Sequence, residues 1–463
     1  MTEKQKYWFP SGVYTLLQNV VLFISGFTSF VLLVRFYDKS EFGTWALYLA
    51  FSSFIDVAQA GFVTNGLIKF ASLQNKKSEY SNVLTASLVL QILFTVMIII
   101  LILIFAPILG NAWRNINLQK LLMNYPIYAI SQIPFQFLIA VEQANFSFKN
   151  QFYGNLIRNV IFLTLISVIV FSHSNFPVYA LPLIQAIAVL SGAFVLYYSL
   201  RKELHLSFGI DFNWIKQLIN FGKYVFGSNV VSILFTNIDQ ILLGYYFDTK
   251  AVATYNTAMR VGNFSDIPLN SVATIVYPKT NQRLQSLGEK SLRHLYEKSV
   301  ALILAFVIPS SIILILLTEP IIKLIATEQY LDVIPVIYII ICFSYFKPFI
   351  RYSGLIFQAL NKSEIQFRLL IFLLFINLVL DILLIPKYNL IGAGVGSIIS
   401  LFIGIFIVLN LLKKMLDVQI RRIFRYTFEY YFDLIEFAIF FEEYKEYFEE
   451  KKSEKGNELF KEK

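Results

Sequence analysis

The chain has 463 residues, of which 57% are hydrophobic and 15% are charged. Average soluble domains are about 45–50% apolar and about 25% charged, so this composition excludes an ordinary soluble protein and makes lipid the expected solvent. The formal net charge of +9 would fit nucleic-acid binding, but the basic residues lie in loops between apolar segments, where they report membrane orientation instead.

Apolar runs broken by charged residues, prolines and glycines predict about twelve membrane-spanning helices, each close to the roughly 20 residues that cross a bilayer. The first follows a short basic N-terminus without a small-residue cleavage site, so we expect an uncleaved helix rather than a signal peptide. The fourth, eighth and tenth are the least apolar and contain prolines, which are tolerated where neighbouring helices or a water-lined cavity satisfy the freed carbonyl groups. The expected helices run near residues 11–36, 42–68, 81–109, 119–141, 151–171, 177–200, 219–247, 251–278, 293–318, 331–358, 366–386 and 390–413.

Lysine and arginine residues predict the orientation of these helices. If the N-terminus is inside, most loop Lys and Arg residues fall on the inner side, and the positive-inside rule then places both termini in the cytoplasm. The expected outer loops carry only Arg35, Lys39, Arg114, Lys120, Lys250, Lys323 and Lys387.

One turn occurs twice in the sequence, 210 residues apart. Residues 32–48 read LLVRFYDKSEFGTWALY and residues 242–258 read LLGYYFDTKAVATYNTA, so that Asp38 falls on Asp248. Acidic residues coincide again farther along in the same register, and charged residues are scarce enough in spanning segments to favour a true repeat. An offset of six helices gives both halves the same orientation, which predicts a parallel repeat about an axis along the membrane normal.

We therefore expect an all-α polytopic membrane protein whose two six-helix bundles, 1–205 and 206–416, surround a central cavity. Residues 417–463 differ, because their apolar stretch 434–441 is short and interrupted by Glu436. This pattern predicts an amphipathic helix at the membrane interface, followed by a charged cytoplasmic tail.

Two segments resemble a known family of transporters. One is FGKYVFGSNVVSILFTNIDQILLGYYFDTKAVATYNTAMRVGNF (221–264), with Asp239 near the middle of its first helix. The other is NLVLDILLIPKYNLIGAGVGSIIS (377–400), with Pro386 in its turn. They resemble the seventh-to-eighth and eleventh-to-twelfth helices of Wzx-type polysaccharide or O-antigen flippases. Those belong to the polysaccharide transporter family of the multidrug/oligosaccharidyl-lipid/polysaccharide exporter superfamily, and the resemblance covers residues 8–415.

The resemblance implies a transporter of two lobes that moves an undecaprenyl-pyrophosphate-linked oligosaccharide from the inner to the outer leaflet of a bacterial cytoplasmic membrane. The product would be a surface polysaccharide such as O-antigen or capsule. The implied partners are that lipid-linked glycan, membrane lipids, and the polymerase and chain-length regulator of the same pathway, with no nucleic acid and no cofactor. Many relatives continue into two further spanning helices, which residues 417–463 do not resemble.

A lipid-linked pyrophosphate is large, polar and anionic, so its passage requires a hydrated cavity with cations that meet the phosphates. The expected spanning helices contain Arg158, Arg260, Lys347 and Arg351. We expect Arg260, well inside the eighth helix, to face the cavity and bind substrate. The structural alternative for Arg260 is an ion pair with a nearby acid. For the other three cations it is a place near a helix end, from which the side chain reaches the interface.

Asp239 lies in a short polar cluster within an otherwise apolar helix. A carboxylate there either binds a proton or sodium ion that couples a gradient to transport, or fixes Arg260 in a buried pair. Asp56 and Asp266 share the repeat register, which favours a common structural role. The single cysteine, Cys342, lies in an apolar run and the three histidines are far apart, so the sequence predicts no metal site.

Two other functions compete with the flippase. A drug or cation antiporter of the same superfamily would need an acidic cavity for cationic substrates, and the intramembrane Arg and Lys residues favour the flippase over it. A membrane polysaccharide polymerase would need a sizeable outer loop, whereas the expected outer loops are only about 5–12 residues long. The sequence also has no D-x-D, G-x-S-x-G or P-loop motif, so we do not expect an enzyme.

Overall fold

The structure is a computed structural model that describes residues 3–74, 76–145, 147–172, 175–202, 204–207, 209–360 and 362–433. The regular structure of these residues is entirely helical. Nine of the described helices are long and apolar enough to cross a membrane. The predicted class, an all-α polytopic membrane protein, is confirmed.

The first half of the chain forms seven helices, of which α2 and α3 run on through one turn of π-helix. Their bounds are α1 (Glu3–Phe36), α2 (Lys39–Gln59), η1 (Ala60–Thr64), α3 (Asn65–Ala71), α4 (Lys77–Ala112), α5 (Ile116–Ala144), α6 (Phe148–Phe171), η2 (Val178–Ala180) and α7 (Leu181–Leu200).

The second half repeats this pattern of long helices with short breaks. Its elements are α8 (Phe212–Tyr246), α9 (Thr249–Gly262), η3 (Asn263–Ser265), α10 (Asp266–Leu287), α11 (Lys290–Ala326), η4 (Glu328–Val333), α12 (Ile334–Ala359) and α13 (Ser363–Leu416). The long α13 is interrupted at Asn389 (φ 54°, ψ −134°), three residues after Pro386. The break falls between the eleventh and twelfth helices predicted from the sequence. Residues 420–433 form one more helical segment.

Helices occur where the sequence predicts them, with ends that differ by a few residues in most cases. α5 and the α9–α10 segment occupy the places of the fourth and eighth expected helices, which are among the least apolar of the set. The number of twelve spans stays a prediction, because these two segments are not among the nine candidate spans of the described chain. The expected tail beyond residue 433 lies outside the described residues.

The described chain groups into two compact units that cut across the two halves of the sequence. Unit 1 comprises Met1–Met259, Glu319–Val336 and Leu370–Ser397. Unit 2 comprises Arg260–Thr318, Ile337–Leu369 and, as far as it is described, Ile398–Lys463. The predicted boundary between residues 205 and 206 stays a prediction.

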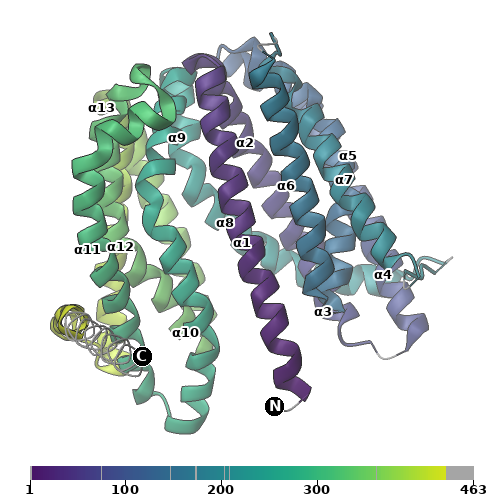
Figure 1. Cartoon of the computed structure of the whole chain (residues 1–463). Coiled ribbons are helices and arrows are strands. Elements are labelled where there is room, and N and C mark those ends of the chain that lie inside the picture. Colours follow the sequence, from purple (N-terminus) through teal and green to yellow (C-terminus); the bar gives the residue numbers. More distant parts are fainter. Residues whose placement is uncertain are drawn as a thin grey trace, which may run out of the picture. The chain divides into compact units, whose positions relative to one another are not determined.

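Unit 1 contains α1 to α7 packed against one another. α5 packs on α4 and α7, α6 packs on α7, and α1 packs on α6 (Figure 1). The large side chains buried in this unit include Tyr48, Tyr125 and Phe135. The apolar α4 exposes many aliphatic side chains, among them Leu93 and Ile104, which is the pattern of a helix with one side in lipid.

The turn that occurs twice has the same local structure at both places. Asp38 and Asp248 each cap the following helix, accepting a hydrogen bond from the backbone N–H three residues later at 2.8 and 2.9 Å. Thr44 and Thr254 each donate from Oγ1 to the carbonyl four residues earlier, at 2.8 and 3.0 Å. The sequence repeat is therefore also a repeat of local structure, whereas superposition of the two six-helix halves stays a prediction.

In unit 2, α10 and α11 form a hairpin through Gly288 (Figure 1), whose φ of 74° lies in the left-handed region that favours glycine. Ser291 Oγ donates to the carbonyl oxygen of Arg283 across this turn at 3.2 Å. α12 packs closely on the end of α9, where a Cβ at Gly262 would lie 2.6 Å from Ile340. These contacts fix the helices that carry the charged residues of unit 2.

Candidate functional site

A cluster of buried polar side chains joins α8, α9 and both parts of α13 within unit 1. Asp239 Oδ2 accepts hydrogen bonds from Tyr255 Oη and, at 3.0 Å, from Ser397 Oγ. Asn377 Nδ2 donates to Asp239 Oδ1 at 3.1 Å and to Asp381 Oδ2 at 2.6 Å. One amide thus bridges two carboxyl groups, and all five side chains are buried.

Local structure explains how α13 supplies three members of this cluster. Asn377 and Asp381 are four residues apart, so they share one face of the helix. The break at Asn389 turns the chain, which brings Ser397 back to within 3.0 Å of Asn377. Gly396 leaves room for the carboxyl group, because a Cβ there would lie 2.6 Å from Asp381 Oδ1.

This arrangement can hold a proton or a small cation. Asp381 Oδ1 is buried and has no hydrogen-bond partner among the described residues. Two buried carboxylates that share one amide repel each other when both are ionised, so a positive charge between them is favourable. Carboxylate oxygens are ligands that hard cations prefer, whereas the amide of Asn377 turns its Nδ2 toward both carboxyl groups. The described residues contain no group of three or more His, Cys, Asp and Glu side chains that could hold a metal ion.

The structure gives Asp239 uncharged partners. Its three hydrogen bonds come from the phenol of Tyr255, the hydroxyl of Ser397 and the amide of Asn377. The sequence alternative in which Asp239 fixes Arg260 stays a prediction.

A second charged group lies in unit 1 between α2, α5 and α6. Tyr128 Oη donates to Asp56 Oδ2 at 2.8 Å. The guanidinium of the half-buried Arg158 lies 5.0 Å from the ring centre of Phe135 and interacts electrostatically with Asp56. Arg158 is thus held among side chains of its own unit.

A third group lies in unit 2. Lys347 Nζ is 2.7 Å from Asp266 Oδ1 and donates to Asn263 Oδ1 at 2.8 Å. Asp56 and Asp266, which share the repeat register, therefore each bond to the fourth helix of their own half, α5 and α12. The partner is a tyrosine in one half and a lysine in the other, and the equivalence of the two positions stays a prediction.

The two remaining predicted cations are exposed. Arg260 lies in the last turn of α9, and Arg351 lies on α12 one turn after Lys347. Exposure of a guanidinium on a spanning helix is costly against lipid, so such residues usually face water or a polar substrate. Of the four predicted cations, Arg260 and Arg351 are the exposed residues.

A further group of contacts lies where α2 and α9 begin, and sequence reasoning missed it. Lys39 Nζ pairs with Asp332 Oδ2 at 2.6 Å. Ser40 Oγ and Thr249 Oγ1 are 3.1 Å apart. A Cβ at Gly43 would lie 1.6 Å from the carbonyl oxygen of Thr249, so only glycine allows this approach. The two copies of the repeated turn therefore touch each other.

The long apolar helices and the charges buried between them define a polytopic α-helical membrane protein of the transporter class. A family model described as "Polysaccharide biosynthesis protein" matches residues 32–335. The chain belongs to this family, and the resemblance to polysaccharide flippases is confirmed.

Two relatives show how far the similarity extends. The chain is 25% identical over 390 residues to the uncharacterized membrane protein MJ1068 of Methanocaldococcus jannaschii, covering 79% of this chain and 76% of the relative. It is 21% identical over 290 residues to the teichuronic acid biosynthesis protein TuaB of Bacillus subtilis, covering 60% of this chain and 57% of TuaB.

Two solved structures share the fold. The lipid II flippase MurJ in its inward closed conformation superposes with a TM-score of 0.73 at 18% identity, over 93% of this chain and 92% of MurJ. An inward-facing multidrug resistance transporter of the MATE family superposes with a TM-score of 0.71 at 14% identity, over 85% of this chain and 95% of that one. At these identities the likeness shows the fold alone.

Proposed function

We propose that the protein translocates an undecaprenyl-pyrophosphate-linked oligosaccharide across the cytoplasmic membrane for surface polysaccharide biosynthesis. The family match over residues 32–335 carries this proposal. The fold does not choose between substrates, because a lipid II flippase and a multidrug transporter both share it. The family description supports a polysaccharide precursor as the substrate, because it names polysaccharide biosynthesis.

We infer roles for the four cations from their surroundings. Arg260 and Arg351 are exposed and are suited to meet the two phosphates, because a guanidinium can pair two phosphate oxygens at once. Lys347 is paired with Asp266, so it meets substrate only when that ion pair opens, and Arg158 lies over the ring of Phe135.

Energy coupling is assigned to the cluster around Asp239. Binding of a proton or sodium ion between Asp239 and Asp381 would remove the repulsion of two buried carboxylates. The cluster ties α8 and α9 to both parts of α13, so the bound cation would change how these helices hold together. The proposed location is the bacterial cytoplasmic membrane with both termini inside, and the pathway partners are a polymerase and a chain-length regulator.

Deletion of the gene in its own host tests the function. We expect loss of surface polysaccharide and accumulation of lipid-linked repeat units that only reagents inside the cell can reach. An antiporter predicts a different result: surface polysaccharide stays normal and the cells become sensitive to cationic dyes. A polymerase predicts that single repeat units reach the outer surface but are not joined.

A further inference from the structure

The segment after α13 forms a further helix that begins a short distance beyond the end of α13. α13 ends at Leu416, and Asp417 adopts a left-handed conformation with φ 57°. Helical structure resumes at residue 420 and continues to residue 433 within the described chain. Three connecting residues reach at most about 10 Å, so this helix must begin close to the point where α13 leaves the membrane.

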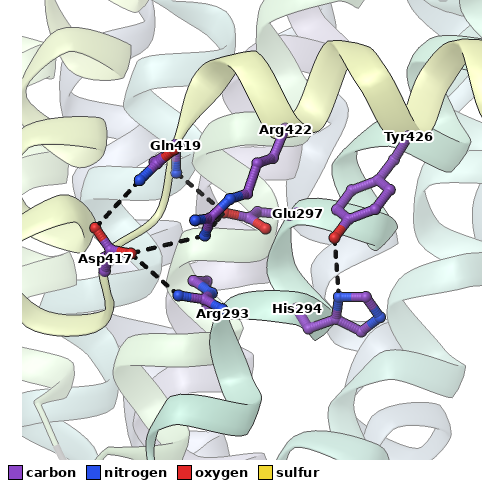
Figure 2. A network of polar contacts seen from close by, with 7 residues as sticks. All are labelled: Arg293, His294, Glu297, Asp417, Gln419, Arg422 and Tyr426. Carbon is purple, nitrogen blue, oxygen red and sulfur yellow. Dashed lines mark hydrogen bonds and ion pairs between the residues drawn. The ribbon is translucent and has the colours of Figure 1, made fainter.

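A polar network holds this helix to α11 (Figure 2). Glu297 is buried in α11, and its Oε1 accepts a hydrogen bond from the backbone N–H of Gln419 at 3.0 Å. Arg422 Nη1 lies 3.9 Å from the same oxygen. Arg293 Nη1 pairs with Asp417 Oδ2 at 3.1 Å and fixes the turn itself.

Contacts farther along set which face of the helix is turned toward the protein. Ile423 and Thr427 are buried, and Thr427 Oγ1 lies 3.4 Å from the carbonyl oxygen of Ala301. Tyr426 Oη and His294 Nδ1 are 3.2 Å apart (Figure 2). These contacts fix the rotation of the helix about its own axis, so its other side remains exposed.

The other side is apolar and exposed. Ile420, Phe424, Phe428 and Phe432 recur every four residues, and 47%, 47%, 60% and 65% of their respective surfaces are exposed. Residues four apart share one face, so these side chains form a continuous stripe. A stripe of three phenylalanines on a rigid helix is costly in water and favourable in the acyl region of a bilayer.

Positive charge borders this stripe. Arg421 is exposed on the same helix, and Lys413 and Lys414 are exposed in the last turn of α13. Arg425 is also exposed, but its Nε pairs with Glu429 Oε1 at 2.8 Å. Basic side chains beside an apolar helix face attract the phosphates of anionic lipids.

We propose that residues 420–433 bind the surface of an anionic phospholipid leaflet. The stripe of Ile420, Phe424, Phe428 and Phe432 enters the acyl boundary, and Arg421, Lys413 and Lys414 meet lipid phosphates. Continuity with α13 and the bordering charges favour a lipid surface over a second copy of the chain or a partner protein. This inference rests on the spanning helices and not on the flippase function, so the two can fail separately.

Two spin labels on opposite sides of the helix test the proposal. Full-length protein with Cys342→Ser carries either Phe428→Cys on the stripe or Asp433→Cys, an exposed position five residues farther on and therefore about 140° around the helix, in nanodiscs of phosphatidylglycerol. The Phe428→Cys label should be relaxed by oxygen, which concentrates in lipid, more than by a water-soluble nickel complex. The Asp433→Cys label should show the reverse order. Equal access of nickel to both labels, or shielding of the Phe428→Cys label from both reagents, would overturn the proposal, the second in favour of a protein partner.

Lipid charge gives an independent test. In phosphatidylcholine nanodiscs the nickel accessibility of the Phe428→Cys label should rise several-fold over its value in phosphatidylglycerol. Arg421→Gln should reduce this difference, whereas Lys387→Gln should not, because Lys387 is also exposed but lies beside the break of α13, in an expected outer loop. No dependence on lipid charge, or an equal effect of the two substitutions, would refute the role of the charges that border the stripe.

Discussion

Replacing Asp239 with asparagine separates a coupling role from a packing role. The side chain keeps its shape and loses one negative charge. One amide oxygen can still accept from Tyr255 and Ser397, while the amide nitrogen faces the Asn377 donor, so one hydrogen bond is lost. The loss of one buried hydrogen bond costs about 1–3 kcal/mol. Relief of the repulsion with Asp381 offsets part of this cost, so the folded protein should remain abundant.

The effect on a bound cation should be much larger. A carboxylate and a cation about 4 Å apart interact by about 4 kcal/mol at an effective dielectric constant near 20. Loss of that charge should weaken cation binding by about a thousandfold. We therefore expect Asp239→Asn protein at near-normal levels in the membrane, with export that no longer responds to an imposed sodium or pH gradient.

The assay compares surface polysaccharide, membrane abundance by immunoblot, and gradient response in vesicles. Tyr255→Phe is the matched control, because it removes one donor to Asp239 and leaves the carboxylate charge. It should retain the gradient response with at most a modest loss of rate. If Asp239→Asn reduces abundance as much as export, or leaves the gradient response intact, the coupling assignment is wrong.

Three further outcomes follow from the described contacts. Arg260→Ala should abolish surface glycan while leaving the abundance of the protein in the membrane normal. Arg260→Lys should retain part of the export, because an ammonium group keeps the charge without the planar fork of the guanidinium. Full export by Arg260→Ala would show that Arg260 has no part in the mechanism. Lys347→Ala should lower abundance on immunoblots because it leaves Asp266 without its cation, and Lys347→Arg should restore it. Asp248→Ala should lower stability by about 1 kcal/mol through loss of the helix cap, whereas Asp248→Asn should be nearly neutral in a thermal-shift assay.

The sequence predicts what depends on neighbours along the chain. Helices form where apolar runs reach membrane length, and the caps at Asp38 and Asp248 follow from an acid three residues before a free backbone N–H. The break near Asn389 was marked by Pro386, which cannot continue a helix in the ordinary way. These features are local, so a single sequence contains the whole signal.

Contacts between helices that are far apart in the sequence could be predicted only in part. The polar cluster around Asp239 had a partial signal, because Asn377 and Asp381 stand four residues apart in an apolar helix. Nothing in the sequence states that Ser397 returns to the same point after the break, or that Tyr255 of another helix reaches it. The pair of Lys39 with Asp332 had no signal, since any exposed lysine and aspartate fit that description equally well.

The contact between the two copies of the repeated turn is the clearest structural use of the repeat. Gly43 in the first copy corresponds to Ala253 in the second, so one copy lacks the Cβ that the other has. The missing Cβ is what allows the carbonyl oxygen of Thr249 to approach α2. If transport alternates between closed and open arrangements of the helices, this contact belongs to one arrangement only. A substitution that weakens the contact should then shift the equilibrium between the two arrangements and should not unfold the protein.

Gly43→Ala tests that reasoning. The new Cβ would lie 1.6 Å from Thr249 O, where real contacts are at least 3.0 Å, so the two turns must move apart. Overpacking of this kind costs about 1–3 kcal/mol, which changes a two-state balance by about 5-fold to 150-fold. In a Cys342→Ser, Thr249→Cys protein, the buried cysteine should react slowly with an impermeant maleimide in cells or inverted vesicles, and Gly43→Ala should speed that reaction from one side. Gly26→Ala is the control, because nothing lies within 4 Å of its added Cβ. Unchanged labelling with Gly43→Ala would mean that the two turns do not separate, and the contact would then be a fixed part of the fold.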